Sequence, residues 1–369
     1  MQLGPDLTPE ELLRATLVEV APGTELRDAL DRVIRGRTGA LFVLGYDDQV
    51  AAMCSGGFEL DVEFSAPKLR ELAKMDGAVV LDWEHQRIVR AGVQLLPDAT
   101  IETQESGTRH RTADRVAKQS GFPVISVSQS MQIVALYVGG LRHVLQDTEE
   151  LGSRAKQAVA TLERYRQRLD EVSGALSALE VEDLVTVRDA AQVGQRQEMV
   201  ARIADEIDGL LLELGTEGRL LGLQYQELII GVARTRRLLI KDYMPEPLPG
   251  QSPDQVAEQV DGIEAALSSL TAAELLELGN IANVMGIGAL PLGLDAPVSP
   301  RGYRLVTRVP RIPQILADRI VDHFGSLQRV LAASMEDLEQ VEGVTGQRAR
   351  AIREGLSRIA ETSMVESYA

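Results

Sequence analysis

An apolar stripe in the middle of the chain constrains its fold more than any other feature of the sequence. From Leu151 to Leu179, apolar residues recur at alternating intervals of four and three. That spacing places one apolar face along a single long helix, which must pack against other helices. A second apolar helical stretch, from Met199 to Leu214, can supply the partner. The pattern therefore predicts a helical bundle or spine in this part of the chain.

Two breaker-rich segments divide the remaining sequence. A chain of 369 residues is too long for one comfortable core, so several domains are expected. Proline and glycine are concentrated at 244–253 and 291–303. The sequence predicts a first domain at 1–150, a helical spine or linker at 151–300, and a wholly helical domain at 301–369.

The first domain combines short apolar runs with helical patterns. Ser65 is a plausible N-cap for a helix at 66–75, and Thr112 for a helix at 113–120. Apolar runs of this length, bounded by turn residues, predict buried strands. The predicted strands are Ala40–Tyr46, Ala78–Asp82, Pro123–Ser128 and Gln132–Gly140. The pattern indicates an α/β domain with a largely buried sheet.

Composition places the chain among ordinary globular proteins of a reducing compartment. It is 44% hydrophobic and has one cysteine, Cys54, so no intramolecular disulfide can form. No Cys/His spacing suggests a zinc site, and the N-terminus has no signal-peptide pattern. No apolar run approaches the roughly 20 residues that a membrane span needs. We expect a cytoplasmic protein that does not contact a membrane.

The charge is unevenly distributed. A net charge of −17 disfavours a protein that coats nucleic acid non-specifically. Residues 301–369 nevertheless hold ten arginines against nine acidic residues, a net of +1, which leaves −18 for the rest. Within them, 301–311 has four arginines and no acid. Any contact with DNA is therefore expected in this last domain.

The segment 105–112 contains the parts of a polyphosphate site. Gly107 allows the backbone to approach a ligand closely. Arg109 and Arg111 can present fixed forks of donors to phosphate oxygens, and His110 adds a donor or proton carrier. The helix predicted to follow would turn its free N–H groups and positive dipole end to the same ligand. On composition alone, the alternative is a basic loop that happens to precede a helix.

Asp76 lies where a predicted helix runs into a predicted strand, a place where α/β folds often carry functional groups. A carboxylate there could hold Mg²⁺ against a triphosphate, or draw a proton from a hydroxyl. The alternative for an isolated Asp-Gly pair is a turn or a cap. Neither a Walker A sequence nor a Rossmann glycine fingerprint is present, which disfavours the familiar ATP-binding folds.

Two motifs resemble the signatures of the diadenylate cyclase domain, which are Asp-Gly-Ala and Arg-His-Arg. They stand complete at Asp76–Ala78 and Arg109–Arg111. Their surroundings also resemble the family, namely SGGF at 55–58, LRELAKMDGAVVLD at 69–82 and GTRHRTADRVAKQ at 107–119. The whole chain resembles the DNA-integrity scanning diadenylate cyclases. That resemblance implies a cyclase domain with a mixed central sheet, a helical spine and a C-terminal tandem helix-hairpin-helix domain.

The resemblance implies roles for individual residues. Asp76 is implied to position a metal, Mg²⁺ or Mn²⁺, and to help activate a ribose 3′-hydroxyl. Arg109, His110 and Arg111 are implied to be catalytic with it. Ser106 and Asp114 stand where the family usually has Thr and Glu. The nucleotide contacts that the resemblance implies are Gly77, Ala78, Leu95, Gly107, Thr108, Arg109, His110, Arg111, Thr112 and Ser128.

The implied reaction joins two ATP molecules into cyclic di-AMP. Each 3′-oxygen attacks the other ATP's α-phosphorus and two pyrophosphates leave, which requires in-line positioning and neutralisation of phosphate charge. The product is symmetric, whereas this chain carries each motif once. Two copies must therefore face each other across a two-fold axis. We expect at least a homodimer, and the resemblance implies an octamer with facing cyclase domains.

The segment 312–356 resembles a tandem helix-hairpin-helix module that binds DNA. Such hairpins aim backbone N–H groups at phosphates and read no base sequence, so branched or junction DNA is the expected partner. Bound branched DNA is expected to lower cyclase activity through the spine. Thr345 takes the place of a glycine usual in the family, which could weaken the phosphate contact. The predicted DNA contacts are Arg311, Ile312, Gly343, Val344, Thr345, Gly346, Arg348 and Arg350.

Other readings remain open. One is an ATP-sensing DNA-repair binding protein without cyclase activity, which would bind ATP and leave it unchanged. Another is a C-terminal module used only for protein contacts. A nuclease is disfavoured, because the sequence lacks the clustered carboxylates of a two-metal site.

Overall fold

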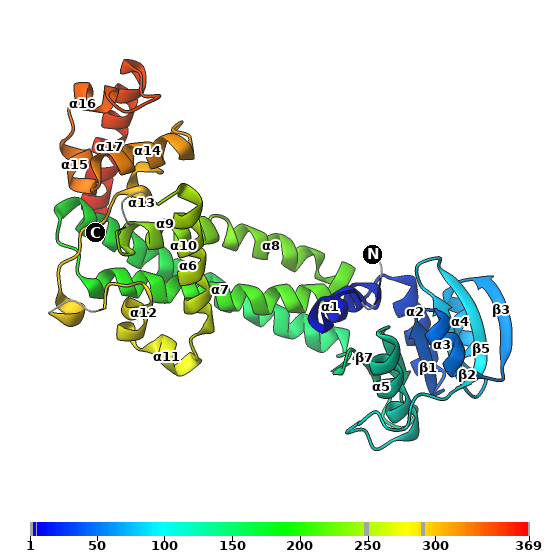
Figure 1. Ribbon diagram of the computed structural model, residues 1–369. Helices are drawn as coiled ribbons and strands as arrows, with labels where there is room; N and C mark the ends of the chain where they lie inside the picture. The colour runs from blue at the N-terminus through cyan, green and yellow to red at the C-terminus, as the bar shows by residue number, and fades with distance from the viewer. Residues whose placement is uncertain (1–2, 5, 247–250, 289–291, 368–369) are drawn as a thin grey trace. The chain divides into compact units, whose positions relative to one another are not determined.

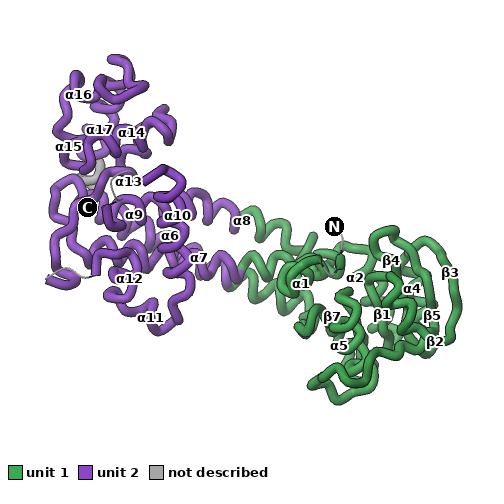
Figure 2. Tube along the Cα trace, in the orientation of Figure 1, with its two compact units in different colours: residues 1–157, 207–223 green, residues 158–206, 224–369 purple. Residues whose placement is uncertain are grey.

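The computed structural model describes residues 3–4, 6–246, 251–288 and 292–367 (Figure 1). Contacts between Cα atoms divide the chain into two compact units, residues 1–157 with 207–223 and residues 158–206 with 224–369 (Figure 2). These units do not test the predicted domain boundaries at 150 and 300, so the three domains stay a prediction. The predicted linkers at 244–253 and 291–303 lie partly outside the described residues.

A mixed sheet of eight strands forms the centre of the first unit, as predicted. The strand order is β2-β5-β4-β1-β6-β7-β8, and β3 pairs with β5 beside this path. The β1 and β4 strands are parallel, and the other pairs are antiparallel. The strands are β1 (Ala40–Leu44), β2 (Cys54–Ser55), β3 (Phe58–Glu63), β4 (Ala78–Asp82), β5 (Arg87–Leu95), β6 (Val124–Val127), β7 (Val134–Val138) and β8 (Leu141–Val144).

Helices cover both faces of this sheet. One face packs against α1 (Pro9–Glu19), α2 (Glu25–Arg35) and α4 (Ala66–Leu72), through the strand side chains that include Phe42 and Leu44. The other packs against α3 (Asp48–Met53) and α5 (Thr108–Ser120), through the alternate side chains, such as Leu41 and Val43. Because both faces are buried, these strands read as continuous apolar runs, which is why the sequence predicted them.

Four strands escaped prediction because their side chains are not uniformly apolar. In β3 most side chains are exposed, and β5 alternates between buried core residues and more exposed ones. Both contain charged residues that pair across the ladder, such as Arg90 with Glu59 at 2.7 Å. The short strands β2 and β8 were missed as well.

One edge of the sheet gathers the chain segments that carry the predicted motifs. The parallel pairing of β1 and β4 brings Gly39 and Gly77 to the same edge, just before these strands. Antiparallel pairing brings the ends of β5 and β6, at Leu95 and Ser128, to that edge as well. The α5 helix precedes β6 and therefore begins at this edge and ends at the opposite one.

Long helices follow the sheet. The predicted stripe lies on α6 (Thr148–Glu182), where Leu151, Ala155, Leu162, Leu169 and Leu176 are buried. The second predicted stretch is part of α7 (Val187–Leu214). None of the described helices combines the length and the apolar character needed to cross a bilayer. The other helices are α8 (Arg219–Ile229), α9 (Val232–Tyr243), α10 (Pro253–Ser269), α11 (Ala272–Leu276), α12 (Leu278–Val284), α13 (Tyr303–Val306), α14 (Gln314–Phe324), α15 (Leu327–Ala332), α16 (Met335–Glu339) and α17 (Gly346–Ser367).

A buried polar cluster joins α6, α9 and α13 within the second unit. The Arg304 guanidinium and the Tyr243 hydroxyl both donate to Glu180, at 2.5 and 2.7 Å. Asp242 accepts the backbone N–H groups at the start of α13, from Gly302, Tyr303 and Arg304. Burial and the neighbouring Glu180 raise the pKa of Asp242 to about 7. The cluster fixes α13, the first helix of the C-terminal region, against the long helix α6.

Candidate phosphate-binding site

The Arg-His-Arg motif lies in the first turn of a helix. The prediction that the helix begins at Ala113 with Thr112 as its N-cap is wrong, because α5 begins at Thr108 and Gly107 occupies the N-cap position. The apolar face begins only at Ala113, since the first turn extends beyond the sheet and is mostly exposed. Gly107 has no side chain to cap the helix, so the first N–H groups remain available to an anion.

An open cleft of about 910 Å³ lies at this helix start. Five of the predicted nucleotide contacts line it together, although the two segments that supply them are far apart in sequence. A cleft that combines cationic side chains, hydroxyls and free helix N–H groups suits a polyphosphate. The predicted residues in its lining are Gly107, Thr108, Arg109, His110 and Ser128, and the others are Arg37, Gln129, Ser130 and Gln132.

Asp76 and Gly77 lie at the same edge of the sheet. Asp76 directly precedes Gly77 and β4, and Ser128 directly follows β6. One strand, β1, separates β4 from β6, so these points are two strand spacings, about 10 Å, apart. That separation is within the span of one nucleoside triphosphate.

Gly77 is required by the backbone around it. Its φ of +106° lies in the region that favours glycine, and an added Cβ would stand 2.7 Å from the carbonyl oxygen of Val93 on β5. A register shift between β4 and β5 follows at Ala78 and Val79. The glycine therefore lets β5 approach closely beside Asp76.

The Asp76 carboxylate fits a divalent cation that is shared with a ligand. Asp76 is exposed, and among the described residues no side chain forms a hydrogen bond or an ion pair with it. Within the same part of the chain, no group of three or more His, Cys, Asp or Glu side chains could enclose a metal. Mg²⁺ and Mn²⁺ suit a single carboxylate, because phosphate oxygens and water complete their coordination.

Several predicted contacts lie outside the cleft lining. Leu95 and Ala78 are buried in the core, so only their backbone could face a nucleotide. Arg111 and Thr112 do not line the cleft. The Arg111 side chain instead donates to the carbonyl oxygen of Glu105, at 3.4 Å. Their nucleotide contacts remain a prediction.

Arg37 and Gly39 are site residues that the sequence analysis missed. Arg37 is exposed and lines the cleft. A Cβ on Gly39 would overlap the Nη1 atom of Arg109, so the glycine makes room for that guanidinium. Neither residue belongs to a recognisable motif, and only the pairing of β1 with β4 and β6 brings them to the site.

His110 is held neutral by its surroundings. Burial lowers the pKa of the imidazole, the charges of Arg142 and Arg109 lower it further, and Glu105 opposes them. The Nδ1 atom lies 2.9 Å from the hydroxyl oxygen of Tyr137. Near neutral pH the imidazole therefore carries one N–H group rather than two.

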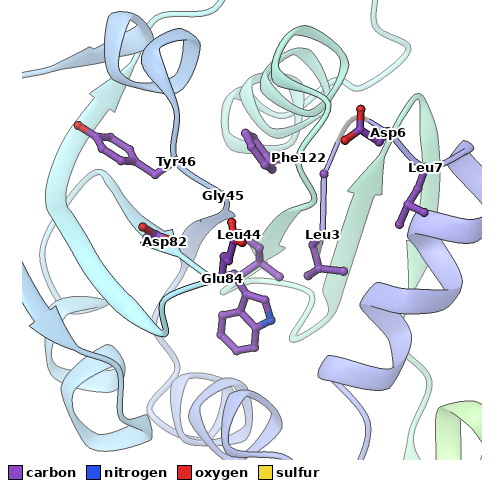
Figure 3. Close-up of a pocket in the computed structure, with 11 residues that line it drawn as sticks. Leu3, Asp6, Leu7, Leu44, Gly45, Tyr46, Asp82, Glu84 and Phe122 are labelled. Atoms are coloured by element: carbon purple, nitrogen blue, oxygen red, sulfur yellow. The ribbon is translucent and has the colours of Figure 1, made fainter. Parts of the chain in front are cut away.

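A smaller cavity at the opposite edge does not suit a triphosphate. It has a volume of about 230 Å³ and lies beside the ends of β1 and β4 (Figure 3). Asp6, Asp82 and Glu84 line it, together with apolar side chains such as Phe122 and Leu44. Carboxylates repel phosphate, and the volume is below the usual range for nucleotide-sized ligands.

The first predicted DNA hairpin precedes α14. Arg311 is exposed and has a φ of +66°, whereas Ile312 is half-buried and packs against the C-terminal core. The N-cap residue of α14 is Pro313, which forms no side-chain cap. The first N–H groups of α14 therefore lack a side-chain partner of the kind that caps most helices.

The second predicted hairpin precedes α17. Gly343 has a φ of +91°, Val344 is buried, and Gly346 is the first residue of the helix. Arg348 donates to the carbonyl oxygen of Gly343 at 2.7 Å and so closes the turn. Thr345 is exposed at the helix start, and Arg350 is exposed one turn later. This geometry suits the predicted role, which stays a prediction.

Comparisons with known proteins match nearly the whole chain. Residues 27–141 match the family described as "DisA bacterial checkpoint controller nucleotide-binding", and residues 145–290 match "DisA bacterial checkpoint controller linker region". A DNA integrity scanning protein DisA from Acidothermus cellulolyticus is 60% identical over 359 residues, which are 97% of this chain and 96% of the relative. The protein of the same name from Kineococcus radiotolerans is 58% identical over 368 residues, 99% of both chains.

Proposed function

Since the chain belongs to the family of DNA integrity scanning proteins DisA and is a diadenylate cyclase, we propose that it condenses two ATP molecules into cyclic di-AMP and releases two pyrophosphates. The observation that carries the proposal is the shared sheet edge. It brings the uncapped start of α5, with Arg109 and His110, into one cleft with Ser128. Asp76 stands two strands away along the same edge.

The residues of the site have different roles in nucleotidyl transfer. Arg109 and Arg37 neutralise the triphosphate, and the N–H groups of the first turn of α5 donate to it. In each step an O3′–Pα bond forms while the bond from Pα to the bridging oxygen of pyrophosphate breaks. The proton of the 3′-hydroxyl passes to the Asp76 carboxylate.

Asp76 would hold a divalent cation, which would neutralise phosphate charge. The family supports a divalent cofactor in general, and we propose Mg²⁺ or Mn²⁺ because a single exposed carboxylate suits both. Gly77, the neighbour of Asp76, lets β5 approach the backbone closely at this point.

DNA is the proposed partner of the C-terminal helices. The relatives are named for DNA integrity scanning, and the starts of α14 and α17 offer N–H groups next to exposed arginines. We propose that branched DNA binds at Arg311, Ile312 and the 343–346 turn, and that this binding lowers cyclase activity. We further propose an octamer in which cyclase domains face each other in pairs.

Incubation with ATP and Mn²⁺ or Mg²⁺, followed by chromatography, tests the reaction. The expected product is cyclic di-AMP with two pyrophosphates for each molecule. Bound but unchanged ATP would instead support the ATP-sensing alternative.

The variant Asp76→Asn should reduce product formation by about 100-fold or more, because it removes both the proton acceptor and the metal ligand. The matched control is Asp82→Asn, at the opposite end of the same strand, which should keep the wild-type rate. Thermal unfolding of both variants checks that the fold is intact. Full activity of Asp76→Asn would remove Asp76 from the site.

A further inference from the structure

A buried tyrosine hydroxyl lies directly behind His110. Tyr137 is in β7, its residue is 1% exposed, and its hydroxyl oxygen is 2.9 Å from Nδ1 of His110. His110 also lines the cleft, and its Cδ2 atom lies 3.4 Å from the position that a Cβ on Gly107 would take. His110 therefore contacts the Tyr137 hydroxyl and also borders the cleft.

Three side chains, Arg142, Glu105 and His110, lie around the Tyr137 hydroxyl. Arg142 on β8 is the register partner of Tyr137. A guanidinium can only donate, so it does not compete for the hydroxyl proton. The acceptors near the hydroxyl are Nδ1 of His110 and the Glu105 carboxylate, which also pairs with Arg142 at 3.0 Å. The 2.9 Å contact between the hydroxyl oxygen and Nδ1 has the length of a hydrogen bond.

We propose that Tyr137 is a positioning residue, whose hydroxyl donates to Nδ1 of His110 and thereby keeps the imidazole proton on Nε2, directed at phosphate in the cleft. The inference rests on the proposed function and assigns a residue outside both motifs. Without the hydroxyl, the neutral ring could carry its proton on Nδ1 and present a lone pair to the phosphate, which would repel it.

The protonation states of both partners agree with this arrangement. Burial raises the pKa of Tyr137 to about 12, so the phenol retains its proton. The groups that face the imidazole are Tyr137, Arg142, Arg109 and Glu105. Burial and the two arginines lower the pKa of the imidazole by more than Glu105 raises it. A neutral imidazole carries one N–H proton. When the Tyr137 hydroxyl donates to Nδ1, that proton must be on Nε2.

The variant Tyr137→Phe tests the inference, because it removes the hydroxyl and keeps the ring that fills the core. Cyclic di-AMP formation at pH 8 should fall about tenfold, which corresponds to one hydrogen bond. The deficit relative to wild type should narrow as the pH falls, because an imidazolium carries N–H on both nitrogens. The control Tyr165→Phe, on α6, should keep the wild-type rate.

A double variant separates positioning from a structural role. Glutamine at position 110 can donate from its amide without any tautomer, so Tyr137→Phe should cause no further loss in a His110→Gln background. A wild-type rate for Tyr137→Phe, a deficit constant with pH, or additive losses in the double variant would each overturn the proposal. A wild-type rate for His110→Ala, which removes the donor, would instead count against the proposed phosphate role of His110.

Discussion

At the residue scale, the site depends on glycines as much as on charged groups. Gly39 precedes β1, and any side chain there would overlap the Arg109 guanidinium. The backbone of Gly39 does not need a positive φ, so alanine is allowed conformationally. The requirement for glycine comes from the space that an arginine occupies, a contact between residues 70 positions apart in sequence.

The variant Gly39→Ala should therefore change activity more than stability. The new methyl group displaces the flexible end of Arg109, so the free energy of unfolding should change by no more than about 0.5 kcal/mol. ATP turnover should fall roughly tenfold, because a charge-assisted hydrogen bond to phosphate is weakened. Product rates and thermal unfolding midpoints measure the two effects.

Gly152→Ala is the matched control, since a Cβ at Gly152 on α6 meets no atom within 4 Å. It should keep the wild-type rate. A wild-type rate for Gly39→Ala as well would show that Arg109 can be displaced without cost and is not a phosphate ligand.

At the element scale, helix N-termini form part of both candidate sites, the phosphate cleft and the predicted DNA contact. The α5 helix begins without a side-chain cap in the phosphate cleft, and α14 begins without one in the C-terminal region. In the second hairpin, Arg348 is engaged by the Gly343 carbonyl, whereas Arg350 lines an open cavity of about 540 Å³ with Arg353 and Arg358. Arg350 is therefore the cleaner probe of DNA contact.

The variant Arg350→Ala should weaken DNA binding by a similar factor for different sequences of one DNA shape, because a phosphate contact carries no base information. The slope of log K against log salt concentration should decrease in magnitude by about 1. Fluorescence anisotropy with junction DNA across a salt series measures it. Arg168→Ala, an exposed arginine on α6, should leave the slope unchanged. An unchanged slope for Arg350→Ala would remove it from the DNA contact.

At the scale of the whole molecule, the product sets the minimum assembly. Cyclic di-AMP has two equivalent halves, and the chain carries each motif once. In the proposed mechanism, each ATP presents its 3′-hydroxyl to an ATP held by a second copy. We therefore propose a pair of chains as the smallest active assembly, and the proposed octamer adds scaffolding to that pair.

Dilution should separate binding from turnover. As the protein is diluted through its dissociation range, specific activity should fall to zero while ATP binding by each chain persists. Light scattering reports the assembly state, and fluorescent-nucleotide binding and product chromatography report the two functions. Product made by a verified monomer would contradict the facing-sites mechanism.

The sequence by itself determined the parts of this protein that have a local signature. The central strands β1, β4, β6 and β7 were predicted because burial on both faces makes them apolar throughout. The α6 helix was predicted because its stripe repeats at helical spacing. The chemistry of the Arg-His-Arg segment was also readable, since arginine and helix N–H groups bind phosphate wherever they lie.

The tertiary structure decided which residues share a site. The polar strands β3 and β5, the first turn of α5, and the placement of Arg37 beside Arg109 have no signature in the local sequence. Tyr137 reads as an ordinary core residue until the pairing of β7 with β8 sets it between Arg142 and His110. Strand order and long-range pairing fix these neighbours, and both depend on contacts between distant segments rather than on the residues of any one segment.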